Sequence, residues 1–230
     1  MSTTDNNIVY GTEDILRSLC NSVTKVLSIA TQSQIHYSGM VQRITKTCLK
    51  PDIGCFVLFD GGFSGLVVIN FSSSAAMELY ESYMLHMGMA KNELATSHTS
   101  DEVGNVMGEL MNQIVGDFTG KVARELQTHI TQNQPKMLAL NKQVMLSVDT
   151  NLDSPESRRV TFFTARNNIF YLELAMDKTE FIRIHNEGME HEELDPDALI
   201  AQTKLDAAKP VQAAAPVAND HDDLLDSLGI

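Results

Sequence analysis

Carboxylate and carboxamide side chains share one side of a predicted helix in the segment SDEVGNVMGELMNQIVGDFTG, which begins at Ser100. At about 100° of rotation per residue, five positions form a narrow stripe: Glu102, Asn105, Glu109, Asn112 and Gly116. Apolar residues at helical spacing predict the buried face opposite: Val103, Met107, Leu110, Met111, Ile114 and Phe118. A solvated helix face normally mixes Lys, Arg, Glu and Gln, so this stripe indicates a specific surface.

Glu109 and Asn112 lie on adjacent turns of this helix and point the same way. A carboxylate can hold the ammonium group of a partner, and a carboxamide can both donate to and accept from one water molecule. The pair supplies neither a nucleophile nor a strong base. It suits a reaction in which the attacking water only has to be held in line, as in hydrolysis of a phosphoryl group.

An ordinary solvated surface is the alternative interpretation, because Glu and Asn three residues apart are common on helices. Two features distinguish the stripe from such a surface. Asparagine is a poor residue for a helix interior, yet two occupy the stripe. Gly108, Gly116 and Gly120 each weaken the helix by about 1 kcal/mol relative to alanine. A smooth surface that another protein approaches closely would account for both features.

The elements that must position this helix follow an α/β pattern. Helical spacing covers residues 12–31, with Thr12 as the expected N-cap, and two further helices are expected at 74–89 and from Ser100 to about Thr131. Strand-like runs cover 37–49, 53–59, 63–71, 136–149, 158–166 and 169–176. Several connections are too short for crossovers, which predicts a mostly antiparallel sheet with long helices packed on it. The turn Asp60-Gly61-Gly62 joins two strands and is not a phosphate loop.

Composition limits the classes of partner. The 230 residues include 17 Lys and Arg against 30 Asp and Glu, a net charge of −13, so a nucleic-acid-binding surface is not expected. An acidic protein instead suits a partner with a basic patch. Cys20, Cys48 and Cys55 show no CxxC spacing and are expected to be reduced thiols. The twelve methionines are interpreted as adaptable core filling.

The sequence gives no sign of secretion, a membrane span or a metal site. The first residues lack a basic region followed by an apolar one, and runs such as CFVLF fall short of the roughly 20 residues that cross a bilayer. We therefore expect a cytoplasmic protein with no membrane partner. The seven histidines form no HxxxH or HExxH motif, and His185 and His191 are interpreted as part of a solvated acidic connector.

The character of the chain changes after about Gly188. We expect a globular domain over residues 1–188 and an Ala/Pro-rich flexible linker over 189–219, with one possible short helix capped by Asp195. The last segment, 220–230, combines aspartates with leucines at helical spacing and predicts a helix that docks on a partner. Its expected binding residues are Asp222, Asp223, Leu224, Leu225, Asp226 and Leu228.

The motif from Glu109 through Asn112 to Gly116, with Pro135 following Asn112 after 22 residues, resembles the signature of the CheC/CheX family. These proteins are phosphatases of the chemotaxis response regulator CheY. The order of elements from about Thr12 to Asp177 is also similar, which implies a CheX-like fold with one site. The resemblance implies that Glu109 pairs with the regulator's active-site lysine and that Asn112 places water in line with its aspartyl phosphate. Asn105 and Gly116 would contact the partner.

The ending DDLLDSLGI resembles the C-terminus of CheZ, a different, all-helical CheY phosphatase whose tail helix tethers CheY. Both resemblances imply a phosphorylated CheY-like receiver as the partner. The Mg²⁺ would be held by the receiver, so this chain is expected to bind no cofactor of its own.

Several alternatives stay open. The family usually has Asp or Ser where this chain has Asn105, and Glu102 with Asn105 forms a second ExxN, although Glu102 is interpreted as a partner of the helix dipole. A non-catalytic scaffold that only binds a receiver, as in flagellar-switch proteins, is the main alternative. A sensor domain whose tail recruits a receiver outside chemotaxis is a third. The sequence leaves open whether two chains pair through an edge strand as a homodimer.

Overall fold

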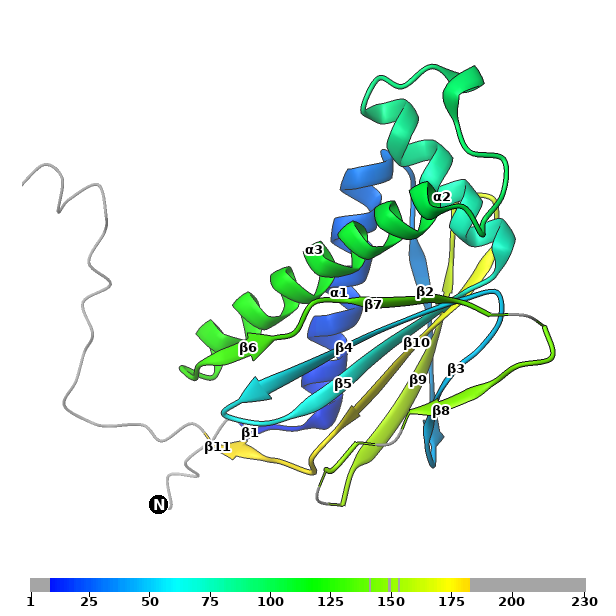
Figure 1. Ribbon diagram of the computed structural model, residues 1–230. Coiled ribbons are helices and arrows are strands. Elements are labelled where there is room, and N and C mark those ends of the chain that lie inside the picture. Colours follow the sequence, from blue (N-terminus) through cyan, green and yellow to red (C-terminus); the bar gives the residue numbers. More distant parts are fainter. Residues whose placement is uncertain (1–8, 141, 149, 153, 183–230) are drawn as a thin grey trace, which may run out of the picture. The chain divides into compact units, whose positions relative to one another are not determined.

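The computed structural model describes residues 9–140, 142–148, 150–152 and 154–182. They form a mostly antiparallel sheet with three long helices on one face, which confirms the predicted fold class (Figure 1). The predicted linker 189–219 and the docking segment 220–230, with its aspartates and leucines, lie outside the described residues. The same holds for His185 and His191. No helix in the described residues combines the length and the hydrophobicity needed to span a bilayer.

All three predicted helices are present, and a short 3₁₀ turn, η1 (Lys91–Glu93), lies between the second and the third. They are α1 (Thr12–Thr31), α2 (Ser73–His86) and α3 (Asp101–Glu125). Ser72 and Ser100 cap α2 and α3 through their side chains. The expected cap of α1 at Thr12 is wrong by one residue. Gly11 is the N-cap, because the Asp14 carboxylate reaches back and accepts a hydrogen bond from the Gly11 amide at 3.2 Å.

The third helix is shorter than predicted. It ends at Glu125 and not near Thr131, because Gln127 takes a left-handed conformation with φ of 51°. The Thr128 amide then donates to the Ala123 carbonyl at 3.0 Å, which closes the helix with a Schellman-type turn. After this turn the chain forms β6 (Ile130–Gln132) and β7 (Lys136–Ala139), which run back alongside α3 (Figure 1).

The main sheet has the strand order β2-β9-β10-β5-β4-β6, and β7 also pairs with β4. The remaining strands are β1 (Val9–Tyr10), β2 (His36–Ile44), β3 (Thr47–Leu49), β4 (Ile53–Gly61), β5 (Gly65–Phe71), β8 (Leu146–Val148), β9 (Glu156–Phe163), β10 (Ile169–Met176) and β11 (Phe181–Ile182). The predicted β4–β5 hairpin is confirmed. Two predicted single strands are wrong, since 37–49 divides into β2 and β3, and 136–149 divides into β7 and β8. The pieces β3 and β8 pair with each other, as do β1 and β11.

The helices bury their apolar faces against one side of the main sheet. The predicted apolar face of α3 is confirmed, with all six residues at most 1% exposed. Cys20, Cys48 and Cys55 are buried free thiols, and burial raises the pKa of Cys20 to about 12. The core-filling interpretation of the methionines is only partly right. Met107, Met111 and Met176 are buried, but other methionines are largely exposed: Met40, Met87 and Met145.

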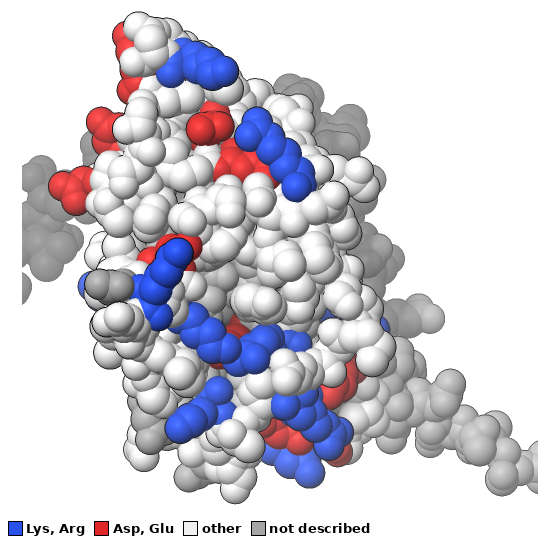
Figure 2. Space-filling view, turned by 90° about the vertical axis from the view of Figure 1, so that its right-hand side faces the viewer, with Lys and Arg blue, Asp and Glu red and all other residues white. Residues whose placement is uncertain are grey.

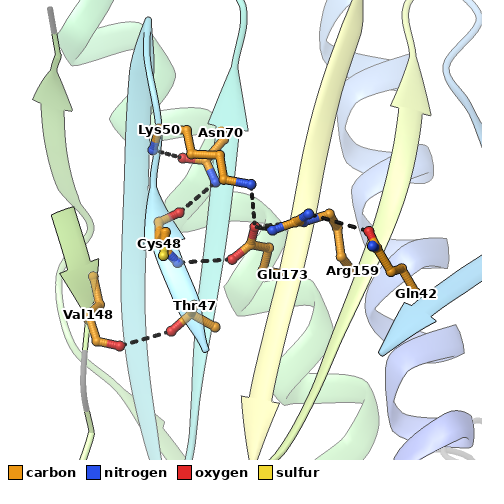
Figure 3. Close-up of polar contacts among 8 residues, drawn as sticks. All are labelled: Gln42, Thr47, Cys48, Lys50, Asn70, Val148, Arg159 and Glu173. Atoms are coloured by element: carbon orange, nitrogen blue, oxygen red, sulfur yellow. Dashed lines mark hydrogen bonds and ion pairs between the residues drawn. The ribbon is translucent and has the colours of Figure 1, made fainter. Parts of the chain in front are cut away.

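On the opposite side of the sheet, β3 is attached through a buried carboxylate (Figure 3). Glu173 on β10 is fully buried and accepts a hydrogen bond from the Cys48 amide at 3.1 Å. The guanidinium of Arg159 lies 2.8 Å from the same carboxylate, and Lys50 Nζ lies at 3.8 Å. Asn70 adds a hydrogen bond from its side chain to the Cys48 carbonyl at 2.9 Å. This cluster fixes β3 on the outer face of the sheet.

The negative charge of the chain is unevenly distributed. Eleven of the 30 acidic residues fall between residues 185 and 230, which hold only two lysines. Figure 2 shows Lys and Arg side chains gathered over the lower half of one face of the described residues. The net charge of −13 therefore does not describe this surface, and the charge of the whole sequence is a poor guide to the partners of the described residues.

An ion-pair cluster joins α1 to α3. The Asp117 carboxylate on α3 lies 2.8 Å from Lys25 Nζ on α1 and also pairs with Lys121. Partial burial alone would raise the pKa of Asp117, but hydrogen bonds from Lys121, Lys25 and Ser22 outweigh it and hold this pKa well below its ordinary value. The charged carboxylate therefore favours the folded state.

Because the pKa of Asp117 is lower in the folded state than in the unfolded one, its stabilisation is complete above the unfolded pKa of about 4. We expect this contribution to be lost as the pH falls below that value. Asp117→Asn should lower stability at pH 7 and flatten the loss of stability below pH 4. Urea unfolding between pH 2 and pH 7 measures both effects. Equal pH profiles for the two proteins would contradict this assignment.

Candidate functional site

The stripe lies along the solvent-exposed side of α3. Asn105, Glu109, Asn112 and Gly116 are all exposed, and the apolar residues between them hold the helix against the core. The structure therefore places the four predicted site residues of α3 on one accessible face. Glu102 is exposed as well, in the acidic first turn, and its carboxylate lies 3.3 Å from the hydroxyl of Tyr80 on α2.

The Glu109 carboxylate makes one hydrogen bond within the described residues. Its Oε1 accepts from Gln113 Nε2 at 3.0 Å, one helical turn further along. The other carboxylate oxygen, Oε2, has no hydrogen-bond or ion-pair partner among the described residues. Glu109 can therefore receive a cation from outside without giving up a contact that the fold needs.

Asn112 contacts a residue that sequence reasoning missed. Gln132 on β6 donates from its Nε2 to Asn112 Oδ1 at 3.2 Å, and its Oε1 accepts from the Thr119 hydroxyl at 3.2 Å. Thr119 lies on α3 and is only 7% exposed. No sequence signal indicated this contact, because the helix was predicted to continue to about Thr131, which would carry Gln132 away from Asn112.

A groove of about 590 Å³ lies beside the first half of α3. It is lined by Ile53, His98, Thr99, Ser100, Asp101, Gly104, Asn105, Gly108, Pro135, Met137 and Ala139. The structure thus brings Asn105 and Pro135 together, although 29 residues separate them in the chain. Glu109, Asn112 and Gly116 do not line the groove and lie further along the exposed side of α3.

The fold itself does not require the glycines on the exposed side of α3. A Cβ atom added at Gly104, Gly116 or Gly120 would meet no other atom within 4 Å. At Gly108 it would make an ordinary contact with Met137 Cγ at 3.5 Å. Alanine would fit at these positions and favour the helix by about 1 kcal/mol each. Packing within the domain therefore does not explain these glycines. A partner molecule that approaches the helix closely would explain them.

The site residues can form hydrogen bonds and ion pairs with a partner. Within the described residues, no three His, Cys, Asp or Glu side chains are grouped so that they could hold a metal ion. The stripe presents two carboxylates and two carboxamides to solvent. Such groups can bind an ammonium ion and order a water molecule.

Sequence comparison places the chain in a family. A family model described as "Protein of unknown function (DUF3334)" matches residues 6–230. The chain belongs to this family. No curated protein matches the sequence.

Solved structures similar to this DUF3334 protein share its fold. The chemotaxis protein CheX from Desulfovibrio desulfuricans aligns with a TM-score of 0.58 and 17% identity, over 71% of this chain and 99% of that one. A CheX–CheY–BeF3–Mg²⁺ complex from Borrelia burgdorferi aligns with a TM-score of 0.53 and 13% identity, over 72% and 99%. FliY from Thermotoga maritima aligns with a TM-score of 0.50 and 17% identity, over 70% and 84%. The predicted CheX/CheC-like fold is confirmed.

Proposed function

We propose that this DUF3334 protein hydrolyses the aspartyl phosphate of a CheY-like receiver in chemotaxis signalling. The observation that carries the proposal is the pair Glu109 and Asn112, exposed one turn apart on α3 and not needed by the core. The fold shared with CheX, and the fact that one similar structure is a complex with CheY, BeF3 and Mg²⁺, support a receiver as partner.

Glu109 holds the receiver in this proposal. Its carboxylate pairs with the ammonium group of the receiver's active-site lysine, and Gln113 keeps it oriented by binding Oε1 at 3.0 Å. A charge-assisted pair that is shielded from water at an interface is stronger than an exposed one. Glu109 therefore sets where α3 docks relative to the phosphoryl group.

Asn112 orients the attacking water. The water oxygen forms a bond to phosphorus while the bond between phosphorus and the aspartate oxygen breaks, and the aspartate carboxylate leaves with the electron pair. The protons of the water remain with the released inorganic phosphate and the solvent. The receiver's own Mg²⁺ neutralises the phosphoryl oxygens, so this chain contributes positioning and no nucleophile.

The C-terminal segment 220–230 tethers the receiver in this proposal, through its aspartates and leucines. A flexible linker of about 30 residues gives an effective concentration of about millimolar, so even weak docking raises occupancy of the α3 site. A variant that ends at Ala218 should need at least about 10-fold more receiver for half-maximal rate and should keep its maximal rate. Phosphate release measured over a range of receiver concentrations tests this. Equal half-maximal concentrations for both chains would refute the tether.

A domain that binds a receiver without fast hydrolysis is the second candidate. Asn105 favours it, because the CheC/CheX family, which the motif resembles, usually has Asp or Ser at this position, and here Asn105 lines the groove. Decay of the phosphorylated receiver separates the two candidates. An enzyme accelerates this decay over many turnovers, whereas a scaffold binds the receiver and leaves the decay rate unchanged.

A further inference from the structure

We infer that Gln132 is a positioning residue for Asn112, an inference that rests on the proposed function. A carboxamide has two ends of opposite character, an oxygen that accepts and an NH₂ group that donates. In the structure, Gln132 donates to Asn112 Oδ1 at 3.2 Å, while Asn112 Nδ2 has no hydrogen-bond partner among the described residues. Gln132 thus selects which end of the Asn112 carboxamide is left for the attacking water.

Thr119 contacts the other end of the Gln132 carboxamide. Thr119 is nearly buried, and its hydroxyl has two acceptors, Gln132 Oε1 at 3.2 Å and the Gly116 carbonyl at 3.4 Å. In the shorter contact the hydroxyl donates to Gln132, which places the NH₂ end of Gln132 toward Asn112. Thr119 and Asn112 are seven residues apart on the same helix. One side chain from β6 therefore bridges two turns of α3 and sets the polarity of the exposed carboxamide.

The backbone that carries Gln132 is held close to β4 by two glycines. Gln132 is paired with Phe59, and the neighbouring Thr131 hydroxyl donates to the Asp60 carbonyl at 3.1 Å. A Cβ atom at Gly61, which has φ of 153°, would lie 2.0 Å from the His129 carbonyl oxygen. A Cβ atom at Gly62 would lie 2.0 Å from Thr128 Oγ1. These glycines, which the sequence assigned to a hairpin turn, also allow β6 to lie where Gln132 reaches α3.

Gln132→Ala and Gln132→Glu test the inference by turnover. Without the donor, the Asn112 carboxamide rotates freely, and kcat should fall about 10-fold with KM within about 2-fold of wild type. A carboxylate at position 132 only accepts, so Asn112 should turn its Nδ2 toward it and present Oδ1 outward. In Gln132→Glu, kcat should therefore be low at pH 7, and its ratio to the wild-type kcat at the same pH should rise as the pH falls toward the ordinary glutamate pKa of about 4.3. Gln134→Ala is the matched control, because that exposed side chain makes no hydrogen bond among the described residues.

The side-chain amide resonances of Asn112 in ¹⁵N-labelled full-length protein give a readout that does not depend on turnover. We expect them to shift in both Gln132 variants and in Thr119→Val, and to stay unchanged in Gln134→Ala. If the wild-type chain fails to accelerate hydrolysis while these shifts occur, the proposed function fails and the Gln132–Asn112 coupling stands. Unchanged Asn112 resonances in the Gln132 variants would overturn the inference. A kcat of Gln132→Ala equal to that of the wild type would overturn it as well.

Discussion

Replacing Asn112 by alanine is expected to lower the rate of receiver dephosphorylation by about 100- to 1,000-fold, which corresponds to roughly 3–4 kcal/mol of activation free energy. The side chain is exposed, and its one hydrogen bond to the described residues is the contact with Gln132. Stability should therefore change by no more than about 0.5 kcal/mol. Stopped-flow decay of the phosphorylated receiver, together with urea unfolding, measures both quantities.

Asn105→Ala is the matched control for this prediction, because it removes the other asparagine from the same exposed face of α3. If Glu109 and Asn112 form the site, Asn105→Ala should reduce the rate by less than about 10-fold. A larger loss in Asn105→Ala than in Asn112→Ala would assign the chemistry to Glu102 and Asn105. A normal rate in both variants would mean that the stripe is only a docking surface.

The largest expected effect on stability comes from Glu173. Glu173→Ala should lower the free energy of unfolding by about 3–5 kcal/mol, because it leaves the partly buried Arg159 and Lys50 without their counter-charge. It also leaves the buried Cys48 amide without its acceptor. The attachment of β3 to the sheet depends on these contacts, so the loss should appear as earlier urea unfolding of the whole domain.

Glu125→Ala at the end of α3 is the control, since that side chain is exposed and makes no ion pair among the described residues. Its stability should remain within about 0.5 kcal/mol of wild type. Glu173→Gln should be less damaging than Glu173→Ala, because an amide oxygen still accepts from Cys48. A loss of less than about 1 kcal/mol in Glu173→Ala would show that this cluster does not hold β3 in place.

Much of the fold could be predicted from the sequence, and α1 and α3 most directly, because these two helices are amphipathic. The spacing of apolar residues in α3 predicts its buried face. The stripe with Glu109 and Asn112 lies on the opposite face and is therefore predicted to be exposed. The end of α3 could not be predicted, since the left-handed residue is Gln127 and not glycine, so the usual stop signal is missing. The division of 37–49 into β2 and β3 could not be predicted either, because both pieces have a strand-like sequence. They differ in their partners, since β3 pairs with β8 and not with the main sheet.

The contacts around the stripe depend on that same turn after α3. Asn105 and Pro135 line one groove, and Gln132 reaches Asn112, only because β6 and β7 run back along the helix. Hydrogen bonds between residues 20 positions apart leave no periodic trace in a single sequence. The net charge of the sequence also failed to predict the basic region on the described surface (Figure 2), because many of the acidic residues follow residue 184.

The most direct test of the central claim is turnover by the full-length wild-type chain. The phosphorylated CheY-like receiver of the same organism would be mixed with one-twentieth of its concentration of this protein, and inorganic phosphate would be followed with time. We expect every receiver molecule to be dephosphorylated faster than it decays alone, so that each chain acts about 20 times. Unchanged decay of a receiver that demonstrably binds the chain would contradict the proposed enzymatic function.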